Sequence, residues 1–534
     1  MAASNGGLAG IRIEVLDTTL RDGTQAEGVD LSVRDKVTVA EALAGFGIDL
    51  IEGGWPGSNP RDAEFFGLMR ERALPGGARL TAFGATRRKD LLPEDDPSLA
   101  ALMESLTPVI TIFGKSWTLH VTDALGVSLE ENLVMIRESV SFLRAAGRRV
   151  IYDAEHFFDG YADDAAYAMA TLGAAAEGGA DTLVLADTNG GRLPEEVFTA
   201  TRQVVARFPR QVIGVHAHND AGLAVANSLA ALRAGARHLQ GTINGYGERA
   251  GNASLTSLIP ALVLKYGADL KAAENLEKLR ELAHFVDERA NQHPDKRAPY
   301  VGDAAFAHKG GVHVSAVLKN PRTYEHVEPE RVGNRRRFLV SDLSGRSNLL
   351  AKLAEAGIGL SRDEASPLLD EVKALERDGY AFEAADASFF LLARRLRGGG
   401  EPFTVSAFKS WTSGDAHGRW QAEATIQVEV GGRSVHTAAW GEGPVGALDN
   451  ALRKALLDFF PELAEVRLAD YKVRVLEGQQ AGTASAVRVL VEMEHPAGRW
   501  NTVGASANVL EASLKALTDG YAYALLKLTP GTGS

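Results

Sequence analysis

The chain has 534 residues, which is too long for one ordinary hydrophobic core, so we expect two or more domains. Its content of 45% hydrophobic and 24% charged residues is typical of a soluble globular protein. A formal charge of -12 argues against a nucleic-acid partner, and the lack of cysteine excludes disulfides, thiolate metal ligands and a cysteine nucleophile. With no secretory signal pattern in residues 1–10 and no apolar run long enough to cross a bilayer, we expect a cytoplasmic protein without a membrane partner.

After a flexible N-terminus (residues 1–10), β-rich runs alternate with helical patterns. The expected strands are Ile11–Leu16, Leu50–Gly53, Arg79–Phe83, Val109–Phe113, Val150–Asp153, Thr182–Ala186, Val212–Val215 and His238–Ile243. The expected helices between them include Val33–Phe46, Leu129–Ala146, Asp163–Gly178 and Leu223–Ala234. This alternation predicts a (β/α)8 TIM barrel over residues 11–270, within the usual size of about 250 residues. A doubly wound sheet is the alternative, but no G-x-G-x-x-G follows the first strand, which argues against dinucleotide binding.

Residues 271–400 are expected to form linker subdomains that are helical and irregular. The pattern predicts an amphipathic helix over Glu274–Arg289, a loop over His293–Gly311 and mostly helix over Ser361–Leu396. Ser361 and Glu364 have the spacing of a capping box. The glycine triplet at residues 398–400 then predicts a flexible connection to a further domain.

An internal repeat fills residues 401–528. Ala424, Ile426, Val428 and Val430 alternate with polar residues, and the same pattern recurs in Val487, Val489, Val491 and Met493. Each run precedes a helix with one apolar stripe, formed by Leu448, Leu452, Ala455 and Phe459 and by Leu510, Leu514, Leu517 and Tyr521. We therefore expect a separate α+β domain of two related halves, which bury their faces against each other or against a second chain.

Polar residues that can carry chemistry recur just past the ends of the expected barrel strands. They are Asp17, Arg21, Asp22, Glu52, Glu155, Asp187, Thr188, His216, His218, Asn244 and Glu248. In a TIM barrel the C-terminal ends of the strands meet at one mouth, where active sites lie. Loops are polar in any case, but this does not explain why carboxylates, an arginine and two histidines recur at the same end.

Three segments of this set suit a metal centre. His216 and His218 stand at i and i+2 of a strand and can direct two imidazoles at one point, where a divalent metal is the expected occupant. Asp22 can add a hard oxygen ligand, while Arg21 can stabilise negative charge on a substrate oxygen. Asn252 closes a glycine-rich loop and can add an oxygen or order a metal-bound water. Taken singly, each segment also has a purely structural explanation. The two histidines fit a capped strand end, Arg21 and Asp22 fit a salt-bridged turn, and the glycine-rich segment fits an ordinary turn.

Together these motifs resemble the DRE-TIM metallolyase superfamily, and within it the 2-isopropylmalate, homocitrate and citramalate synthases. The resemblance rests on Arg21-Asp22, Glu52, the His216/His218 pair and the Gly245–Asn252 loop. Further segments are most similar to the citramalate synthases, namely Asp153–Gly160, Gly114–Trp117 and Ser341–Asn348. The resemblance covers nearly the whole chain, and it includes a C-terminal regulatory domain.

The resemblance also implies a role for each matching residue. Asp22, His216 and His218 would bind a divalent Mg, Mn or Zn ion with Asn252 in the shell, and Arg21, oriented by Glu52, would hold the keto oxygen. Thr188 would bind the carboxylate of the keto acid, Glu155 would lie beside the acetyl group, and His313 with Tyr324 would reach the site of a neighbouring subunit. Either Glu155 or His313 would act as general base. His156 departs from relatives that carry an acid after Glu155.

The implied activity is the condensation of acetyl-CoA with a short α-keto acid, pyruvate, to give citramalate and free CoA. The implied assembly is a homodimer whose C-terminal domain binds an amino-acid effector, isoleucine before leucine. Two alternatives stay open: a 2-isopropylmalate or homocitrate synthase or a related lyase, and an inactive amino-acid-sensing homologue. Trp55 and Trp117 are expected to be packing residues.

Overall fold

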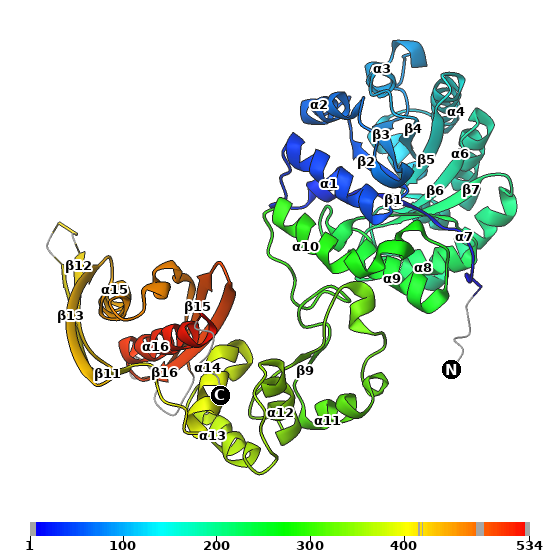
Figure 1. Ribbon diagram of the computed structural model, residues 1–534. Coiled ribbons are helices and arrows are strands. Elements are labelled where there is room, and N and C mark those ends of the chain that lie inside the picture. The colour runs from blue at the N-terminus through cyan, green and yellow to red at the C-terminus, as the bar shows by residue number, and fades with distance from the viewer. Residues whose placement is uncertain (1–6, 415–416, 419, 477–484, 529–534) are drawn as a thin grey trace. The chain divides into compact units, whose positions relative to one another are not determined.

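The computed structural model describes residues 7–414, 417–418, 420–476 and 485–528, and these form two compact units (Figure 1). The first unit comprises Met1–Phe306 and Val327–Arg335, and the second comprises Ala307–His326 and Arg336–Ser534. Residues 1–6 of the predicted flexible N-terminus lie outside the described residues. Of the rest, Leu8 is buried, and the amide of Gly10 donates to the carbonyl of Gly267 at 2.9 Å.

Eight parallel strands close into a barrel in chain order, as the sequence predicts (Figure 1). The strands are β1 (Glu14–Asp17), β2 (Leu50–Gly54), β3 (Arg79–Ala85), β4 (Val109–Lys115), β5 (Arg149–Glu155), β6 (Thr182–Asp187), β7 (Val212–Ala217) and β8 (His238–Gly241). The barrel closes where β8 pairs with β1, with His238 opposite Glu14 and Gln240 opposite Leu16. The doubly wound alternative is thereby excluded.

Helices surround the barrel and cover its strands. They are α1 (Val33–Phe46), α2 (Pro60–Met69), α3 (Pro97–Glu104), α4 (Leu129–Ala145), α5 (Phe157–Asp163), α6 (Ala165–Gly178), α7 (Pro194–Arg207), α8 (Ala224–Ala234) and α9 (Leu255–Ala261). The predicted helix Val33–Phe46 has the observed bounds of α1. Ser32 and Asp35 form a capping box at its start, and Gly47, with φ of 109°, ends it.

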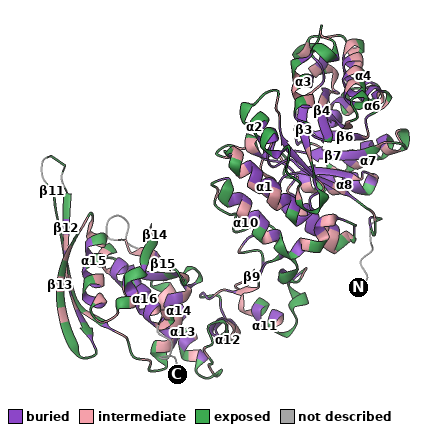
Figure 2. Ribbon diagram, turned by 45° about the horizontal axis from the view of Figure 1, so that its top comes forward, coloured by how far each residue is buried: buried purple, intermediate pink, exposed green. Residues whose placement is uncertain are grey.

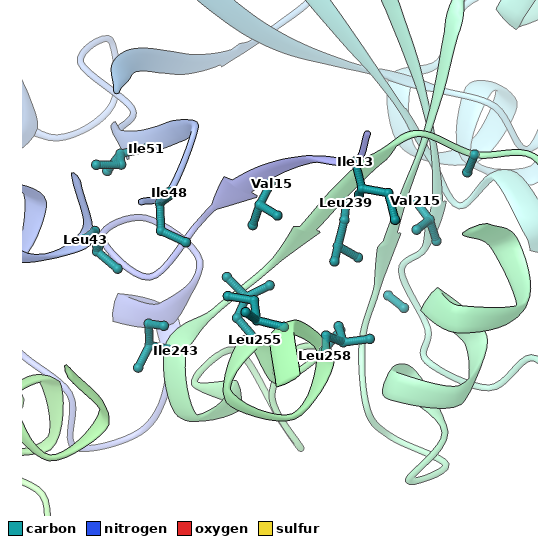
Figure 3. Packing of buried hydrophobic residues seen from close by; sticks show 14 of the residues in the cluster. Ile13, Val15, Leu43, Ile48, Ile51, Val215, Leu239, Ile243, Leu255 and Leu258 are labelled. Carbon is teal, nitrogen blue, oxygen red and sulfur yellow. The ribbon is translucent and has the colours of Figure 1, made fainter. Parts of the chain in front are cut away.

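The hydrophobic core lies between the outer faces of the strands and these helices. Figure 3 shows Val15, Val215 and Leu239 of three barrel strands beside Leu255 and Leu258 of α9. Figure 2 shows the strands buried and the outward faces of the helices exposed. This core fixes the strands and therefore the positions of the residues at their ends.

The interior of the barrel is layered, because alternate residues of each strand point inward. Buried apolar residues from five strands form the middle layer: Leu16, Leu50, Val109, Ile151 and Val184. Two residues earlier along β1 and β5, Glu14 and Arg149 pair at one end of the barrel. Two residues later along β2 and β5, Glu52 and Asp153 lie at the other end, which is the predicted mouth.

The segment after the barrel differs from its prediction at one end. Residues Lys271–Lys278 form a 3-10 helix in which Asn275 leaves helical geometry, and the α-helix α10 spans Leu279–Arg289. The predicted amphipathic helix over Glu274–Arg289 is therefore correct only from Leu279 on. The side chain of Asn275 donates to the carbonyl of Phe46 at the end of α1, a long-range contact that an apolar periodicity does not register.

The second unit begins with four helices and a short two-stranded sheet formed by β9 (Ala307–His308) and β10 (Arg337–Phe338). The helices are α11 (Gly311–Lys319), α12 (Arg346–Glu355), α13 (Ala365–Arg377) and α14 (Asp386–Leu396). The predicted reciprocal hydrogen bonds of Ser361 and Glu364 are present. The helix α13, however, begins only at Ala365, the residue after Glu364.

Two similar halves follow, each a three-stranded antiparallel sheet with a helix. The first has β11 (Thr404–Gly414), β12 (Trp420–Val430), β13 (Arg433–Gly441) and α15 (Pro444–Leu457), and the second has β14 (Arg467–Val475), β15 (Val487–His495), β16 (Gly498–Ser506) and α16 (Val509–Leu528). Residues of both apolar stripes and both predicted strands share one core cluster. The halves therefore bury their faces against each other, as one of the two predicted arrangements requires.

In the part of the chain that the structure describes, no helix has both the length and the apolar character needed to cross a membrane.

We predict that Glu14 stabilises the closed barrel in a pH-dependent way. Burial disfavours its carboxylate, but hydrogen bonds from Arg149 at 2.6 Å and His238 at 2.9 Å outweigh this and hold the pKa of Glu14 well below 4.5. Because the pKa is depressed on folding, this stabilisation is present above the unfolded-state value near 4.5 and is lost as the pH falls through the folded-state value. Glu14→Gln should lower the free energy of unfolding by about 3 kcal/mol at pH 7.

Denaturant unfolding of both proteins at pH 7 and pH 4 measures this effect. The difference between wild type and Glu14→Gln should shrink at the lower pH, and an unchanged difference would contradict the assignment. Glu41→Gln is the matched control, because Glu41 makes an exposed ion pair with Arg72, a type that contributes about 0–1 kcal/mol.

Candidate active site at the barrel mouth

A cavity of about 200 Å³ opens at the mouth of the barrel. Its lining combines charged, imidazole and aromatic side chains: Arg21, Asp22, Gln25, Trp55, Phe83, Phe113, Asp153, Glu155, Ala186, Thr188, His216, His218 and Glu248. Seven of these thirteen residues stand among those predicted from the ends of strands. The barrel therefore brings segments that are far apart in the sequence to one cavity.

Asp22, His216 and His218 are buried and lie together at the wall of this cavity. Their ligand atoms all lie within 4.8 Å of one another. The Nε2 atom of His216 lies 3.2 Å from Oδ2 of Asp22, and that of His218 lies 3.7 Å from the same oxygen. One carboxylate oxygen and two imidazole nitrogens facing one point form a donor set that suits a divalent metal.

Asn252 lies against the same group. Its Nδ2 is 2.6 Å from Oδ2 of Asp22 and 3.3 Å from Nε2 of His216, while its buried Oδ1 has no hydrogen-bond partner. A half-turn of the terminal amide exchanges the two atoms and directs Oδ1 at Asp22 and His216. The unpartnered oxygen and the surplus of carboxylates nearby both fit a cation at this point.

A hydrogen-bonded chain behind His216 fixes the orientation of its ring. Nδ1 of His216 lies 2.9 Å from Oε1 of Gln240, and Nε2 of Gln240 donates to Oδ1 of Asp153 at 3.0 Å. Because Oε1 of Gln240 only accepts, Nδ1 carries the proton, and in the neutral ring Nε2 keeps its lone pair for a metal. Gln240 and Asp153 were not among the predicted ligands.

Arg21 is held between a carboxylate and an aromatic ring. Its Nε donates to Oε2 of Glu52 at 2.5 Å, and its guanidinium carbon lies 3.9 Å from the centre of the Phe83 ring. Oε1 of Glu52 is buried without a partner. Glu52 therefore holds the guanidinium of Arg21 through a direct hydrogen bond.

The electrostatics of this region follow from three carboxyl groups, those of Asp22, Glu52 and Asp153, that interact with the guanidinium of Arg21. Burial raises the pKa of Glu52 to about 7, opposed by Arg21. Burial raises the pKa of Asp17 to about 7 as well. For Asp22, by contrast, the charge of Arg21 and the contact with His216 outweigh burial and hold the pKa far below its ordinary value.

The two histidines respond differently to the same carboxylate. Burial alone would lower the pKa of His216, but its hydrogen bond to Asp22 and the Asp22 charge raise it above 6.5. Burial and the neighbouring His216 lower the pKa of His218 to about 4. At neutral pH His218 is therefore a neutral imidazole, which is the form that binds metals.

Thr188 faces the cavity with its hydroxyl already oriented. Its Oγ1 accepts a hydrogen bond of 2.8 Å from the amide of His156, so the hydroxyl proton is available to a ligand in the cavity. His156 adopts a left-handed conformation with φ of 56°, and its ring lies 4.1 Å from that of His120. This left-handed turn after β5 presents the amide to Thr188.

Glu155 ends β5 at the cavity wall, where it pairs with Lys115 at the end of β4. Both side chains are largely buried. The Nζ atom of Lys115 donates a hydrogen bond to Oε2 of Glu155, which fixes the position of the carboxyl group at the cavity wall.

Three aromatic side chains make the apolar wall of the cavity. The rings of Phe83 and Phe113 stack with centres 5.4 Å apart, and Trp55 contacts both edge-on at 5.7 Å. Trp55 thus packs as predicted and also lines the cavity. The sequence shows no signal for this wall, since aromatic residues in strands are common in any core.

His313 and Tyr324 belong to the second compact unit rather than to the barrel unit. Their rings stack with centres 4.1 Å apart, and Tyr324 is 47% exposed. His308, in the same unit, lies 3.1 Å from Glu325. The contribution of His313 and Tyr324 to a neighbouring subunit's site stays a prediction.

The chain matches three family descriptions along its length. Residues 12–286 match the HMGL-like family, residues 300–379 the homocitrate synthase post-HMGL domain-like family, and residues 383–525 the LeuA allosteric (dimerisation) domain. The chain is 52% identical over 520 residues to the "(R)-citramalate synthase" of Aquifex aeolicus (strain VF5), which covers 97% of this chain and 98% of the relative. It is 50% identical over 526 residues to the protein of the same name from Geobacter sulfurreducens, covering 98% and 99%.

The chain belongs to the citramalate synthase family. A "Probable 2-isopropylmalate synthase" of Methanopyrus kandleri is 33% identical over 515 residues and covers 95% of this chain and 97% of the relative. Membership among the citramalate synthases is therefore better supported than the 2-isopropylmalate synthase alternative. The predicted architecture of a TIM barrel followed by a C-terminal LeuA domain is confirmed.

We predict that His216→Ala removes divalent-metal binding while leaving the fold intact. Residues that merely orient a ligand contribute about 10–100-fold to metal affinity, so loss of a ligand should weaken binding by more than about 100-fold. Metal content after dialysis against a buffered metal solution measures this, with circular dichroism as the test of folding. His436→Ala, an exposed histidine on β13, is the control. Wild-type metal content in His216→Ala would rule out the assignment.

Proposed function

We propose that the barrel mouth condenses acetyl-CoA with pyruvate and hydrolyses the thioester, giving citramalate and free CoA. The observation that carries this proposal is the buried group of Asp22, His216 and His218 on a small cavity that also holds Arg21, Thr188 and Glu155. Full-length identity of about half to relatives named (R)-citramalate synthase supports the same reaction. An inactive sensing homologue is disfavoured, because the expected ligands Asp22, His216 and His218 lie together at the barrel mouth.

A divalent metal would be held by Asp22, His216 and His218, with Asn252 beside them. When bound, such an ion polarises the keto group as a Lewis acid. The cavity's own residues bind the rest of the keto acid. We propose that the oriented hydroxyl of Thr188 donates to the carboxylate of pyruvate.

Arg21 is placed to stabilise the negative charge that develops on the keto oxygen during attack. Its guanidinium is fixed by Glu52 and by the face of Phe83, so it does not have to reorganise as charge appears. Glu52 is therefore a positioning residue for Arg21. It lies too deep in the barrel to line the cavity itself.

We propose Glu155 as the group that accepts a proton from the methyl group of acetyl-CoA. It lines the cavity, where a hydrogen bond from Lys115 holds its carboxyl group in place. The carbanion then attacks the keto carbon of pyruvate, a C–C bond forms, and the new hydroxyl oxygen takes up a proton. Water finally cleaves the thioester and releases CoA. His313 of a neighbouring subunit remains the second proposed acid–base group.

The aromatic wall supports a preference for the smallest keto acid. The rings of Trp55, Phe83 and Phe113 line one side of the cavity of about 200 Å³, and we propose that they contact the methyl group of pyruvate and exclude a branched side chain. This supports pyruvate over 2-ketoisovalerate and 2-ketoglutarate, the substrates of a 2-isopropylmalate and a homocitrate synthase.

We predict that wild-type protein gives its highest kcat/KM with pyruvate among these three keto acids. Phe113→Ala should raise kcat/KM for 2-ketoisovalerate relative to pyruvate by about tenfold or more, since each methylene group accommodated contributes about 1–3 kcal/mol. Release of free thiol from acetyl-CoA measures both. Phe142→Ala on α4, outside the cavity, is the matched control. A clear wild-type preference for 2-ketoisovalerate would contradict the proposed substrate.

We propose further that the protein is a homodimer regulated through its C-terminal domain, and that it serves isoleucine biosynthesis. Support comes from the match of residues 383–525 to the LeuA allosteric (dimerisation) domain and from the two packed halves of that domain. The ligand would be a branched-chain amino acid, isoleucine before leucine. Inhibition then corresponds to a coupling free energy of roughly 1–3 kcal/mol between two separate sites.

We predict that isoleucine inhibits thiol release by the full chain at lower concentration than leucine does. Light scattering should give twice the monomer mass of 56.9 kDa. Alanine at the same concentrations controls for a general amino-acid effect. If isoleucine neither inhibits the enzyme nor shifts its thermal unfolding, the proposed regulation is wrong.

A further inference from the structure

Asp287, a carboxylate on a helix that follows the barrel, is bonded to the loop that carries Asn252. Asp287 lies on α10 and is only 5% exposed. Its Oδ1 accepts a hydrogen bond of 2.6 Å from Nδ2 of Asn244 and a second one from the hydroxyl of Tyr246. The same Nδ2 donates to the carbonyl of Ala283, also on α10, at 2.8 Å. Helix α10 therefore holds the start of the loop through hydrogen bonds from the side chains of Asn244 and Tyr246.

The two ends of the loop from Asn244 to Asn252 lie in close contact. The amide of Asn252 donates to the carbonyl of Gly245 at 3.0 Å. A Cβ atom at Gly251 would lie 2.1 Å from that carbonyl oxygen, and one at Gly247 would lie 1.9 Å from Oδ1 of Asn252. The two ends of the loop are therefore in direct contact, so the position of Asn252 depends on that of Gly245, which follows Asn244 in the chain.

The far end of the loop contacts the metal-binding group directly. Asn252 contacts Asp22 and His216, and its backbone forms an isolated bridge with that of His218. Nη2 of Arg249 lies 3.2 Å from Nδ1 of His218. The position of the loop therefore affects both histidines and the carboxylate.

The loop's backbone requires outside support. Asn244 has a φ of 59° and Arg249 a φ of 58°, in the left-handed region that side-chain-bearing residues adopt only when their surroundings hold them there. The hydrogen bonds of the Asn244 side chain to Asp287 and Ala283 supply such support.

We propose that Asp287 is a positioning residue for the metal site. It ties the loop of residues 244–252 to α10 and so holds Asn252 against Asp22 and the two histidines, without contacting the metal itself. This inference rests on the proposed function, because it requires a metal at Asp22, His216 and His218.

The test compares divalent-metal affinity in four variants of the full chain. Each protein is stripped with a chelator and titrated with Mn²⁺, and its thermal unfolding is recorded separately. Asp287→Ala should weaken Mn²⁺ binding by about 10–100-fold, the usual effect of losing a partner that orients a metal site. Tyr246→Phe removes one of the two donors and should give a smaller loss. Asp287→Asn keeps an oxygen that can accept from both donors and should restore affinity to within about threefold.

Asp303→Ala is the matched control. Asp303 pairs at 2.7 Å with Arg280, which is also on α10, so its loss perturbs the same helix through a different side chain. This variant should keep Mn²⁺ affinity within about twofold, even if its unfolding temperature falls as far as that of Asp287→Ala.

Two results would overturn the inference while leaving the proposed function intact. The first is wild-type Mn²⁺ affinity in both Asp287→Ala and Tyr246→Phe. The second is an Asp287→Asn variant as defective as Asp287→Ala, which would assign the effect to charge rather than to hydrogen bonding. If Asp287→Ala does not fold, Tyr246→Phe and Asp287→Asn still decide between these results. Failure of the wild-type protein to bind Mn²⁺ would instead overturn the metal site itself, and the inference with it.

Discussion

The chemistry proposed for this protein depends on one buried carboxylate shared by two imidazoles. Oδ2 of Asp22 lies 3.2 Å from Nε2 of His216 and 3.7 Å from that of His218, with all three side chains nearly inaccessible to water. A buried anion is unfavourable unless a cation or hydrogen bonds compensate for it. Arg21 compensates in part, and the three ligand atoms lie close enough together to hold a divalent cation as well.

The surrounding fold keeps this group in place from several sides. Alternate residues of the barrel strands form an apolar layer below it. The hydrogen-bonded chain from His216 through Gln240 to Asp153 fixes the ring of His216. Helix α10 holds the loop that carries Asn252. The 3-10 helix that leads into α10 also packs against Gly333, where a Cβ atom would lie 2.2 Å from the carbonyl of Glu277. Gly333 belongs to the short segment Val327–Arg335, whose two ends continue into the second unit.

The sequence alone predicts the barrel and most of the residues at its mouth, because both follow from local periodicity. Strand ends carry the polar residues, and the spacing of His216 and His218 already places two imidazoles on one face. Partners that meet only through the closed barrel could not be predicted in this way: Gln240 reaches Asp153 across 87 positions, and Asp287 reaches Tyr246 from outside the barrel. The sequence analysis also omits the outer strands of the C-terminal halves, which are β11, β13, β14 and β16, and much of β11 and β14 is exposed.

The central claim is that pyruvate binds at this mouth together with a divalent metal. Equilibrium binding of pyruvate to the chelator-stripped protein, before and after the metal is restored, tests it most directly. The account predicts that pyruvate binds tightly only after the metal is restored, and that Asp22→Asn abolishes this difference. Equal pyruvate affinity in the stripped and restored proteins would contradict it.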